Sequence, residues 1–282
     1  MDAQWSDDFH HALHSVLTGE RTGYYEDFGR LDHLAAALRR GFVYVGQHSG
    51  HRRRVHGRAP LGVPGWRLLG YLQNHDQVGN RARGDRIGHL TTPERARVGA
   101  AVVLTAPFVP LLFQGEEWAA SAPFAFFTDH DPELGELVSA GRRREFAEHG
   151  WDVEEVPDPQ DPATVERSRL RWDERDRGEH AATLDWYRRL IALRRATPEL
   201  SDGRCERITV EFDEARCTLV VRRGSVGTFV NLGHEVEQFD VTGADLLLAS
   251  QPGVQIGRDA ILVPADAVAI VRLASEVERD EP

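Results

Sequence analysis

The chain has 282 residues, which is enough for one large domain or two of ordinary size. Its formal charge is −11, from 45 acidic and 34 basic side chains, and every basic residue is an arginine. An acidic chain lacks the surplus cations that neutralise phosphates, so we expect neither a nucleic acid nor a membrane as its partner. No apolar run reaches the roughly 18 residues that span a bilayer. Only two cysteines are present, which excludes a disulfide scaffold and predicts a cytoplasmic protein.

The first part of the chain predicts alternating strands and helices. The apolar run 66–72 indicates a strand, and Thr92-Pro93-Glu94 is typical of a helix start. That helix is expected to continue through Thr105 until Pro107 ends it. Residues 109–113 are apolar at every position, as in a fully buried parallel strand. This order favours a βαβ arrangement.

The residue composition and the hydropathy pattern change twice towards the C-terminus. Residues 136–180 are charged and include the proline-containing run 156–162, which predicts an irregular surface excursion. A last amphipathic helix is expected over 181–196, with Leu184, Tyr187 and Ile191 on one stripe. Beyond residue 200 the runs are short, β-rich and spaced as in an antiparallel sheet protein; they are 207–212, 217–222, 228–232, 245–249, 260–263 and 267–273.

Polar clusters follow both predicted parallel strands, at 73–81 and at 114–118. Catalytic groups of parallel α/β folds lie just past the carboxyl ends of the strands. Amides and carboxylates hydrogen-bond hydroxyl groups and an indole stacks on a sugar ring, so these clusters indicate a neutral polyhydroxylated ligand. The alternative is that Asn74, Asp76 and Asn80 only cap turns and the helix after them.

A third cluster spans residues 5–14. His10 and His14 are four residues apart and would share a helix face, with Asp7 one turn earlier, so a metal site has to be considered. The general-base Glu that a metalloprotease helix carries beside its first His is missing. Stacked and capped histidines are therefore the preferred interpretation, and we expect no metal.

Together these segments resemble the maltooligosyltrehalose trehalohydrolases of the α-amylase clan of glycoside hydrolases. Asn-His-Asp at 74–76 marks the clan, and Asp-Asp-Phe-His-His at 7–11 marks this family within it. The resemblance extends from residue 2 to about 200, and beyond 200 only the β texture agrees. The runs that carry it are 2–14, 17–20, 23–25, 73–81, 112–118, 123–124, 127–129, 141–146 and 156–160.

The resemblance implies a (β/α)8 barrel and hydrolysis of the α-1,4 bond next to the terminal trehalose of maltooligosyl trehalose. No cofactor is implied. The clan's retaining chemistry uses a nucleophile carboxylate and a general-acid carboxylate about 5–5.5 Å apart. A third carboxylate grips sugar hydroxyls and helps to stabilise the transition state.

Position by position, the resemblance gives that third role to Asp76 and places His75 beside the sugar at the cleavage subsite. Glu117, rather than Glu116, matches the carboxylate that follows the eighth barrel strand. Trp118 and Phe127 could be aromatic residues that face the substrate, but packing in the core explains their presence equally well. The further residues expected to contact substrate or line the cleft are Gln73, Asn74, Arg81, Trp118, Asp7, Asp8, His10 and His11.

The family's nucleophile and general acid lie on the fourth and fifth strands, before the segment with which this chain begins. Two aspartates imitate the nucleophile. Asp32 follows Arg30 at the clan's spacing but opens a helical run, so we interpret it as an N-terminal helix residue. Asp266 lies in the last β region, after the barrel. We therefore expect one of three carboxylates here and no activity of the chain alone.

The sequence thus predicts an α/β fold: an incomplete (β/α)8 TIM barrel, its last three strands, over 1–199, followed by an antiparallel β-sandwich domain over 200–282. The expected partners are maltooligosyl trehalose or a related α-glucan, and a missing N-terminal half. A non-catalytic carbohydrate-binding or complementing fragment remains an alternative. Another α-amylase-clan hydrolase is disfavoured by the segment 7–11.

Overall fold

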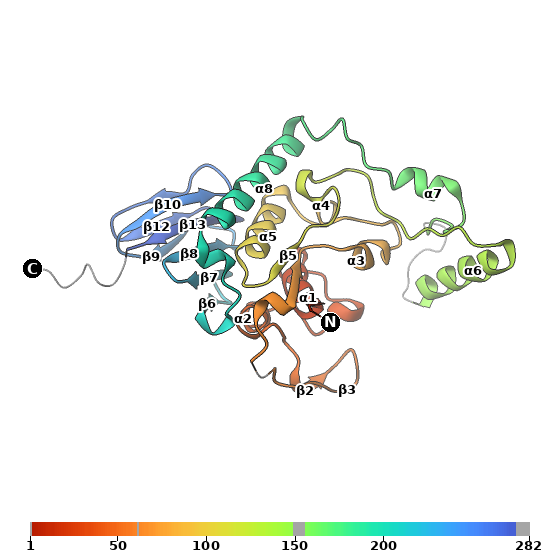
Figure 1. The fold of residues 1–282 in the computed structure, drawn as a ribbon, viewed down its shortest axis with the longest axis horizontal. Coiled ribbons are helices and arrows are strands. Elements are labelled where there is room, and N and C mark those ends of the chain that lie inside the picture. The colour runs from red at the N-terminus through yellow and green to blue at the C-terminus, as the bar shows by residue number, and fades with distance from the viewer. Residues whose placement is uncertain (1, 61, 149–155, 275–282) are drawn as a thin grey trace, which may run out of the picture. The chain divides into compact units, whose positions relative to one another are not determined.

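A computed structural model describes residues 2–60, 62–148 and 156–274 (Figure 1). The chain forms two compact units. Unit 1 comprises residues 1–72, 93–111 and 185–282, and unit 2 comprises residues 73–92 and 112–184.

Unit 1 contains a small parallel sheet. Its strands are β1 (Gln4–Trp5), β4 (Leu68–Tyr71) and β5 (Val109–Leu111), with β4 in the middle. The parallel pairing of β4 with β5 confirms the predicted arrangement. The strands are shorter than expected, because residues 65–67 form the 3-10 helix η2 (Gly65–Arg67). The expectation of a fully buried strand at 109–113 is wrong: Val109 is 40% exposed, since β5 is an edge strand of the described sheet.

Three helices of unit 1 accompany this sheet: α1 (Asp7–Thr18), α2 (Leu31–Arg40) and α5 (Pro93–Thr105), with the 3-10 helix η1 (Gly23–Tyr25) between the first two. The predicted start and end of α5 are confirmed. α5 approaches α1 closely at Gly99, where a Cβ atom would come within 2.7 Å of Leu17 Cδ1. A side chain at this position would therefore displace the side chains of Leu17 and Leu72.

Two arginines, the half-buried Arg194 and the buried Arg223, hold the carboxyl end of α5. Arg194 lies on α8 (Gly178–Ala196), and Arg223 is the last residue of strand β7 (Thr218–Arg223). Burial lowers the pKa of each guanidinium to about 10. Both remain cationic at neutral pH and satisfy carbonyls that a helix end leaves without intrahelical partners. Arg194 donates to the carbonyls of Leu104, Ala106 and Phe108, and Arg223 to those of Thr105, Ala106 and Leu200.

The amphipathic helix predicted over 181–196 is confirmed as the greater part of α8, although its buried face is shifted. Trp186, Tyr187 and Leu190 are buried, whereas Leu184 and Ile191 are only half-buried. Trp186 Nε1 also donates to the carbonyl of Arg97 at 2.9 Å, which ties α8 to α5. The short helix α9 (Pro198–Ser201) and the 3-10 helix η5 (Cys205–Arg207) lead into the β region.

Two antiparallel sheets follow. One has the strand order β10-β13-β8-β7-β6 and the other β11-β12-β9. Apolar side chains of both sheets, among them Phe229 and Ile261, share one buried cluster. The six predicted β runs are confirmed to within two residues at each end, and β9 and β11 were not predicted. The strands are β6 (Ile208–Asp213), β7 (Thr218–Arg223), β8 (Val226–Asn231), β9 (Glu237–Asp240), β10 (Ala244–Ala249), β11 (Gln255–Ile256), β12 (Ala260–Val263) and β13 (Ala267–Leu273).

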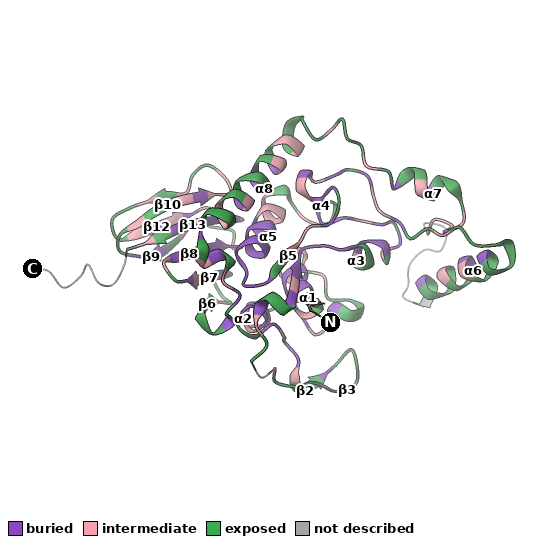
Figure 2. Ribbon diagram, in the orientation of Figure 1, coloured by how far each residue is buried: buried purple, intermediate pink, exposed green. Residues whose placement is uncertain are grey.

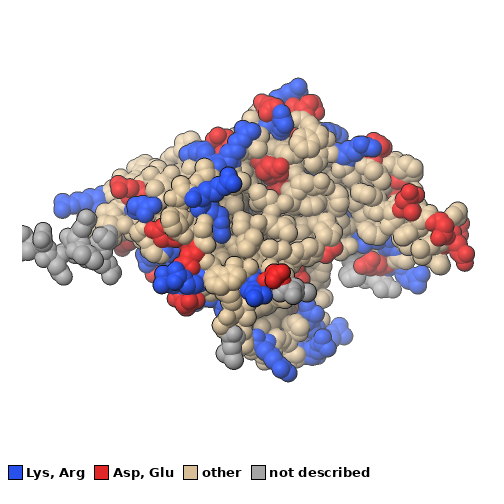
Figure 3. Space-filling model, in the orientation of Figure 1, with Lys and Arg blue, Asp and Glu red and all other residues tan. Residues whose placement is uncertain are grey.

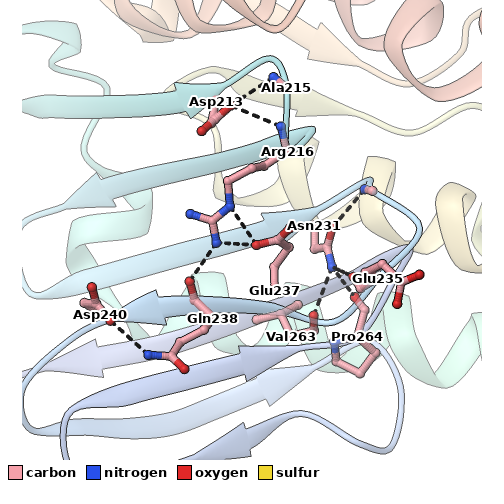
Figure 4. Close-up of polar contacts among 11 residues, drawn as sticks. Asp213, Ala215, Arg216, Asn231, Glu235, Glu237, Gln238, Asp240, Val263 and Pro264 are labelled. Atoms are coloured by element: carbon pink, nitrogen blue, oxygen red, sulfur yellow. Dashed lines mark hydrogen bonds and ion pairs between the residues drawn. The ribbon is translucent and has the colours of Figure 1, made fainter.

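One fully buried polar side chain links the two sheets. Asn231, at the end of β8, donates from Nδ2 to the carbonyl oxygens of Val263 and Pro264, each at 3.0 Å (Figure 4). It also bonds the carbonyl of Glu235 at 2.7 Å and accepts from the N–H of Gly233 at 2.8 Å. Because each buried backbone group needs a partner, this amide fixes the turn after β8 against the end of β12.

Unit 2 corrects the predicted surface excursion at 136–180. Much of this segment is helical, in α6 (Pro132–Glu148) and α7 (Pro162–Arg167), while residues 156–161 are irregular as predicted. Asp161 caps α7 by accepting from the N–H of Ala163, and Pro162 occupies its first position. The high charge that suggested an irregular segment lies instead on exposed helix faces. The other helices of unit 2 are α3 (His75–Gly79), α4 (Ile87–Leu90) and the 3-10 helix η3 (Glu116–Trp118).

Figure 2 contrasts the buried residues of α5 and β13 with the largely exposed α6 and the hairpin of β2 (Val45–Ser49) and β3 (Arg54–Gly57). This hairpin was not predicted. None of the helices in the described part of the chain combines the length and apolar character that a bilayer crossing requires. Cys205 and Cys217 are both free thiols.

Candidate functional site

Asn74, His75 and Asp76 form the start of α3 in unit 2. Asn74 is buried, and its Oδ1 accepts from the N–H groups of Asp76 at 2.9 Å and Gln77 at 3.1 Å. This is an N-cap, so the capping role that the sequence left open for Asn74 is confirmed. The Nδ2 of Asn74 is also buried and has no hydrogen-bond partner among the described residues. The cap thus fixes the helix start and leaves one amide donor unused.

The next two side chains point away from this buried cap. His75 and Asp76 have side chains 56% and 54% exposed, with His75 Nε2 3.3 Å from Asp76 Oδ1. Arg81, at the end of the same segment, is half-buried and lies 4.0 Å from Asp85. An exposed carboxylate and imidazole on a fixed helix start are available to hydrogen-bond a ligand.

A buried polar pair supports this segment. Gln73 donates from Nε2 to Glu116 Oε2 at 3.2 Å, and its Oε1 accepts from the N–H of Ile87 at 2.7 Å. The pair joins the residues after β4 to those after β5 within unit 2. Glu116 is 4% exposed, whereas Glu117 is half-buried. Of these two neighbouring carboxylates, Glu117 is the more accessible.

Arg86 is the cation of this buried region. Its Nε donates to the carbonyl of Ala122 at 2.6 Å and its Nη1 to that of Gln114 at 2.7 Å. Burial lowers the pKa of Arg86 despite the opposing attraction of Glu116 and Glu117. Arg86 therefore holds the segment after β5 by charge-assisted hydrogen bonds.

Trp118 is only 2% exposed, and its ring centroid lies 5.0 Å from that of Trp172. Its carbonyl bonds His180 Nδ1 at 2.9 Å. This burial favours the packing interpretation of Trp118 that the sequence left open. Trp172, which sequence reasoning did not single out, is 59% exposed.

In unit 1 the structure separates the roles of Asp7 and Asp8. Asp7 is exposed at the first turn of α1 and accepts a hydrogen bond from the hydroxyl of the buried Tyr71. Asp8 Oδ2 instead accepts from the backbone N–H groups of Val43 at 2.7 Å and Tyr44 at 3.0 Å. Burial raises the pKa of Asp8, while those two hydrogen bonds act in the opposite direction. Asp8 thus anchors the segment after α2, and Asp7 faces solvent.

His10 and His11 lie in an aromatic cluster. His10 stacks on Tyr71 with ring centroids 5.1 Å apart, and His11 stacks on Tyr24 at 4.9 Å. Burial lowers the pKa of His10 well below its ordinary value and that of His11 to about 3, so both are neutral at pH 7. His14 instead pairs with Glu20 at 2.7 Å.

A metal fits neither this cluster nor any other part of the chain that the structure describes, because no three His, Cys, Asp or Glu side chains there converge as ligands. The two aspartates that imitate a nucleophile also have ordinary partners. Asp32 lies in the first turn of α2, as predicted, and pairs with Arg30 at 2.7 Å. Asp266 pairs with Arg95 at 2.7 Å.

Sequence reasoning missed Tyr71 and Arg86 and set Glu116 aside in favour of Glu117, although all three support the candidate residues. Tyr71 could have been found as the one side chain of its apolar run that carries a hydroxyl. Glu116 and Arg86 gave no signal, because a charged residue is ordinarily exposed and only the fold shows that these two are buried.

Known structures with this fold define the class of protein. A Salmonella typhimurium protein described as an α-amylase is 37% identical to this chain, with a TM-score of 0.83, over 97% of this chain and 47% of that one. The fold is therefore that of α-amylase-type glycoside hydrolases, with mixed helices and strands and an antiparallel sheet domain. No family model matches the chain.

Two curated relatives are more similar still. Proteins named malto-oligosyltrehalose trehalohydrolase from Mycobacterium tuberculosis (strain CDC 1551 / Oshkosh) and Rhizobium sp. (strain M-11) are 46% and 45% identical, over 96% and 95% of this chain. Over nearly its whole length the sequence of this chain is therefore similar to malto-oligosyltrehalose trehalohydrolases. It spans about half the length of the curated relatives it matches, 47% and 46% of these two.

Proposed function

We propose that this chain is the C-terminal portion of an enzyme that cleaves the α-1,4 bond next to the terminal trehalose of maltooligosyl trehalose. Its sequence likeness to proteins named for that activity supports the proposal. The observation that carries it is the exposed pair His75 and Asp76 on the capped start of α3. Such a pair offers a carboxylate acceptor and an imidazole donor to adjacent sugar hydroxyls.

In this proposal Asp76 is the carboxylate that grips substrate hydroxyls and stabilises positive charge as the sugar ring becomes oxocarbenium-like. His75 donates to the same ring, and Glu117 and Arg81 contribute further polar contacts. Gln73 and Asn74 act beneath them: the first bonds Glu116 and the second caps α3. Trp118 supports the segment by packing against Trp172.

The candidate residues of unit 1 also divide into those that contact substrate and those that support the surrounding structure. Asp7 is the proposed substrate-facing carboxylate, because it is exposed and its position is fixed by Tyr71. Asp8, His10 and His11 hold the surrounding backbone and rings in place. No cofactor is part of the proposed reaction.

The finer fold assignment belongs to this proposal. Strands β1, β4 and β5 are taken as the last three strands of a (β/α)8 barrel over residues 1–199, and residues 200–282 as a β-sandwich domain. A barrel closes only with its full set of strands. The nucleophile and the general acid are therefore assigned to an N-terminal half that acts as a partner of this chain. The proposed location of the protein is the cytoplasm.

The test is complementation. The 282-residue chain, alone and mixed with a separately produced N-terminal half of a curated relative, is incubated with maltooligosyl trehalose, and trehalose is quantified. We expect no trehalose from the chain alone and trehalose from the mixture. Asp76→Asn in the chain should slow that release by about 10²–10³-fold, whereas Asp185→Asn, at an exposed position of α8, should not.

Each other outcome contradicts the proposal. Trehalose released by the chain alone and lost on Asp76→Ala would show that the chain carries its own nucleophile. Saccharide binding without restored hydrolysis would favour a non-catalytic carbohydrate-binding fragment. Release of other sugars without trehalose would favour another activity of the α-amylase clan.

A further inference from the structure

The hairpin of β2 and β3 in unit 1 is a strongly basic element in an acidic protein. No Asp or Glu occurs between residues 33 and 75, although the whole chain carries a net charge of −11. Within this stretch Arg52, Arg53 and Arg54 are consecutive at the tip of the hairpin, and Arg58 follows β3. All four are exposed.

The four arginines of this hairpin region differ from other exposed arginines in their ion pairing. None of the four makes an ion pair with a described residue, whereas exposed arginines elsewhere commonly do: Arg204 faces Asp202 at 2.6 Å and Arg30 faces Asp32 at 2.7 Å. Figure 3 shows blue atoms gathered over β2 and β3 without red atoms among them. Asp27 and Glu26 lie close to Gly50 of the tip, but neither forms an ion pair with these arginines in the described structure.

The hairpin contributes little to the core but is held firmly at its base. Val55 is 67% exposed, and most other residues of the two strands are exposed. The Asp27 carboxylate accepts from the Tyr44 hydroxyl at 2.7 Å, the Gly50 N–H at 2.8 Å and the Ser49 hydroxyl. Burial would raise the pKa of Asp27, but these hydrogen bonds outweigh it and the pKa is lowered. Asp27 thus fixes the conformation of the hairpin tip through hydrogen bonds to Ser49 and Gly50.

The backbone of the tip is also unusual. Arg53 has a φ of +51°, in the left-handed region where glycine is favoured and a side chain is strained. The strain is compatible with a side chain that acts outside the fold.

The sheet formed by this hairpin has open edges. Among the described residues, β2 and β3 pair only with each other. An open strand edge presents unpaired N–H and C=O groups that an extended peptide can join. Guanidinium groups beside such an edge bind carboxylates through paired hydrogen bonds.

We propose that the hairpin 45–57, with Arg52, Arg53 and Arg54 at its tip, is a docking site for an extended acidic segment of a partner protein. The guanidinium groups pair with its carboxylates, and the open strand edge binds its backbone. Val55 covers one of its apolar side chains. A nucleic acid is disfavoured, because its dense phosphates are repelled by the net negative charge of the rest of the chain.

The test measures fluorescence anisotropy of a labelled peptide of four Glu-Val repeats titrated with the complete 282-residue chain. The triple variant R52S/R53S/R54S should bind about tenfold more weakly, as expected for the loss of several exposed ion pairs. The control R169S/R175S/R177S removes the same charge from exposed positions in unit 2 and should bind as the native chain does. Circular dichroism compares the folding of all three proteins.

A second variant, R53G, keeps two guanidiniums and relieves the positive φ, so it should fold at least as well and bind about twofold more weakly. Equal weakening by the hairpin and control triples would overturn the proposal, because net charge alone would then explain binding. An oligonucleotide or an anionic vesicle bound more tightly than the peptide would overturn it too. Full binding by a folded R52S/R53S/R54S variant would have the same consequence.

Discussion

The Gln73→Met substitution tests whether the buried pair beneath the candidate site stabilises it. Methionine keeps the length of the side chain but removes the amide. In the native chain that amide donates to Glu116 at 3.2 Å and accepts from the Ile87 N–H at 2.7 Å, and Gln73 is 3% exposed. Both partners would lose a hydrogen bond in a place that water does not reach easily.

The cost follows from these two contacts. An unsatisfied buried backbone donor costs about 1–3 kcal/mol, and a lost hydrogen bond to a charged group about 1.5–3 kcal/mol. We therefore expect the free energy of unfolding to fall by about 3–6 kcal/mol, which for a chain of 282 residues corresponds to a drop in Tm of roughly 5–10 °C. His75→Ala is the matched control, since its side chain is 56% exposed and should change Tm by no more than about 1 °C.

Thermal unfolding followed by circular dichroism, with urea titration in parallel, measures both variants. A Gln73→Met protein within about 0.5 kcal/mol of the native chain would refute the reasoning, because the contact to Glu116 would then contribute nothing to stability. An equally large loss in His75→Ala would refute the division between supporting and exposed residues.

Three further substitutions probe other parts of the structure. Asn231→Ala should lower the free energy of unfolding by about 3 kcal/mol, since it leaves the carbonyls of Val263, Pro264 and Glu235 without this donor. Gln238→Ala at an exposed position of β9 should be near neutral in the same urea titration. The folded-state pKa of His11, about 3, lies below its unfolded value of about 6.5, so its contribution to stability is present above pH 6.5 and lost as the pH falls towards 3. His11→Gln should therefore flatten the stability profile between pH 6.5 and 4 by about 1.4 kcal/mol per pH unit, and an unchanged profile would contradict this. Asp7→Asn should weaken maltooligosyl trehalose binding about tenfold by calorimetry with little change in Tm, whereas a large Tm loss would indicate a structural role.

Local signals in the sequence were sufficient where neighbours in the chain decide the structure. Thr92-Pro93-Glu94 and Pro107 bracket α5, and the alternating runs after residue 200 locate most strands of the two sheets. The same holds for Asp32, which the helical run after it identified as a helix residue. In α6 the high charge was misleading, because a helix with one exposed face tolerates charge as well as an irregular segment does.

The supporting contacts of the candidate site could not be predicted from local signals. Tyr71 meets Asp7 across 64 positions of the chain, and Gln73 meets Glu116 across 43. Which members of a polar cluster are buried depends on such long-range packing. For that reason the sequence could list Glu116 and Glu117 as neighbours but could not show that only the first is buried.

The most direct measurement of the central claim is the kinetics of trehalose release by the chain mixed with an N-terminal half of a curated relative. Comparison of the native chain with Asp76→Asn separates kcat from KM. If Asp76 stabilises the transition state, kcat should fall by about 10²–10³-fold while KM changes little. A variant with native kcat, or one that changes only KM, would contradict the role proposed for Asp76.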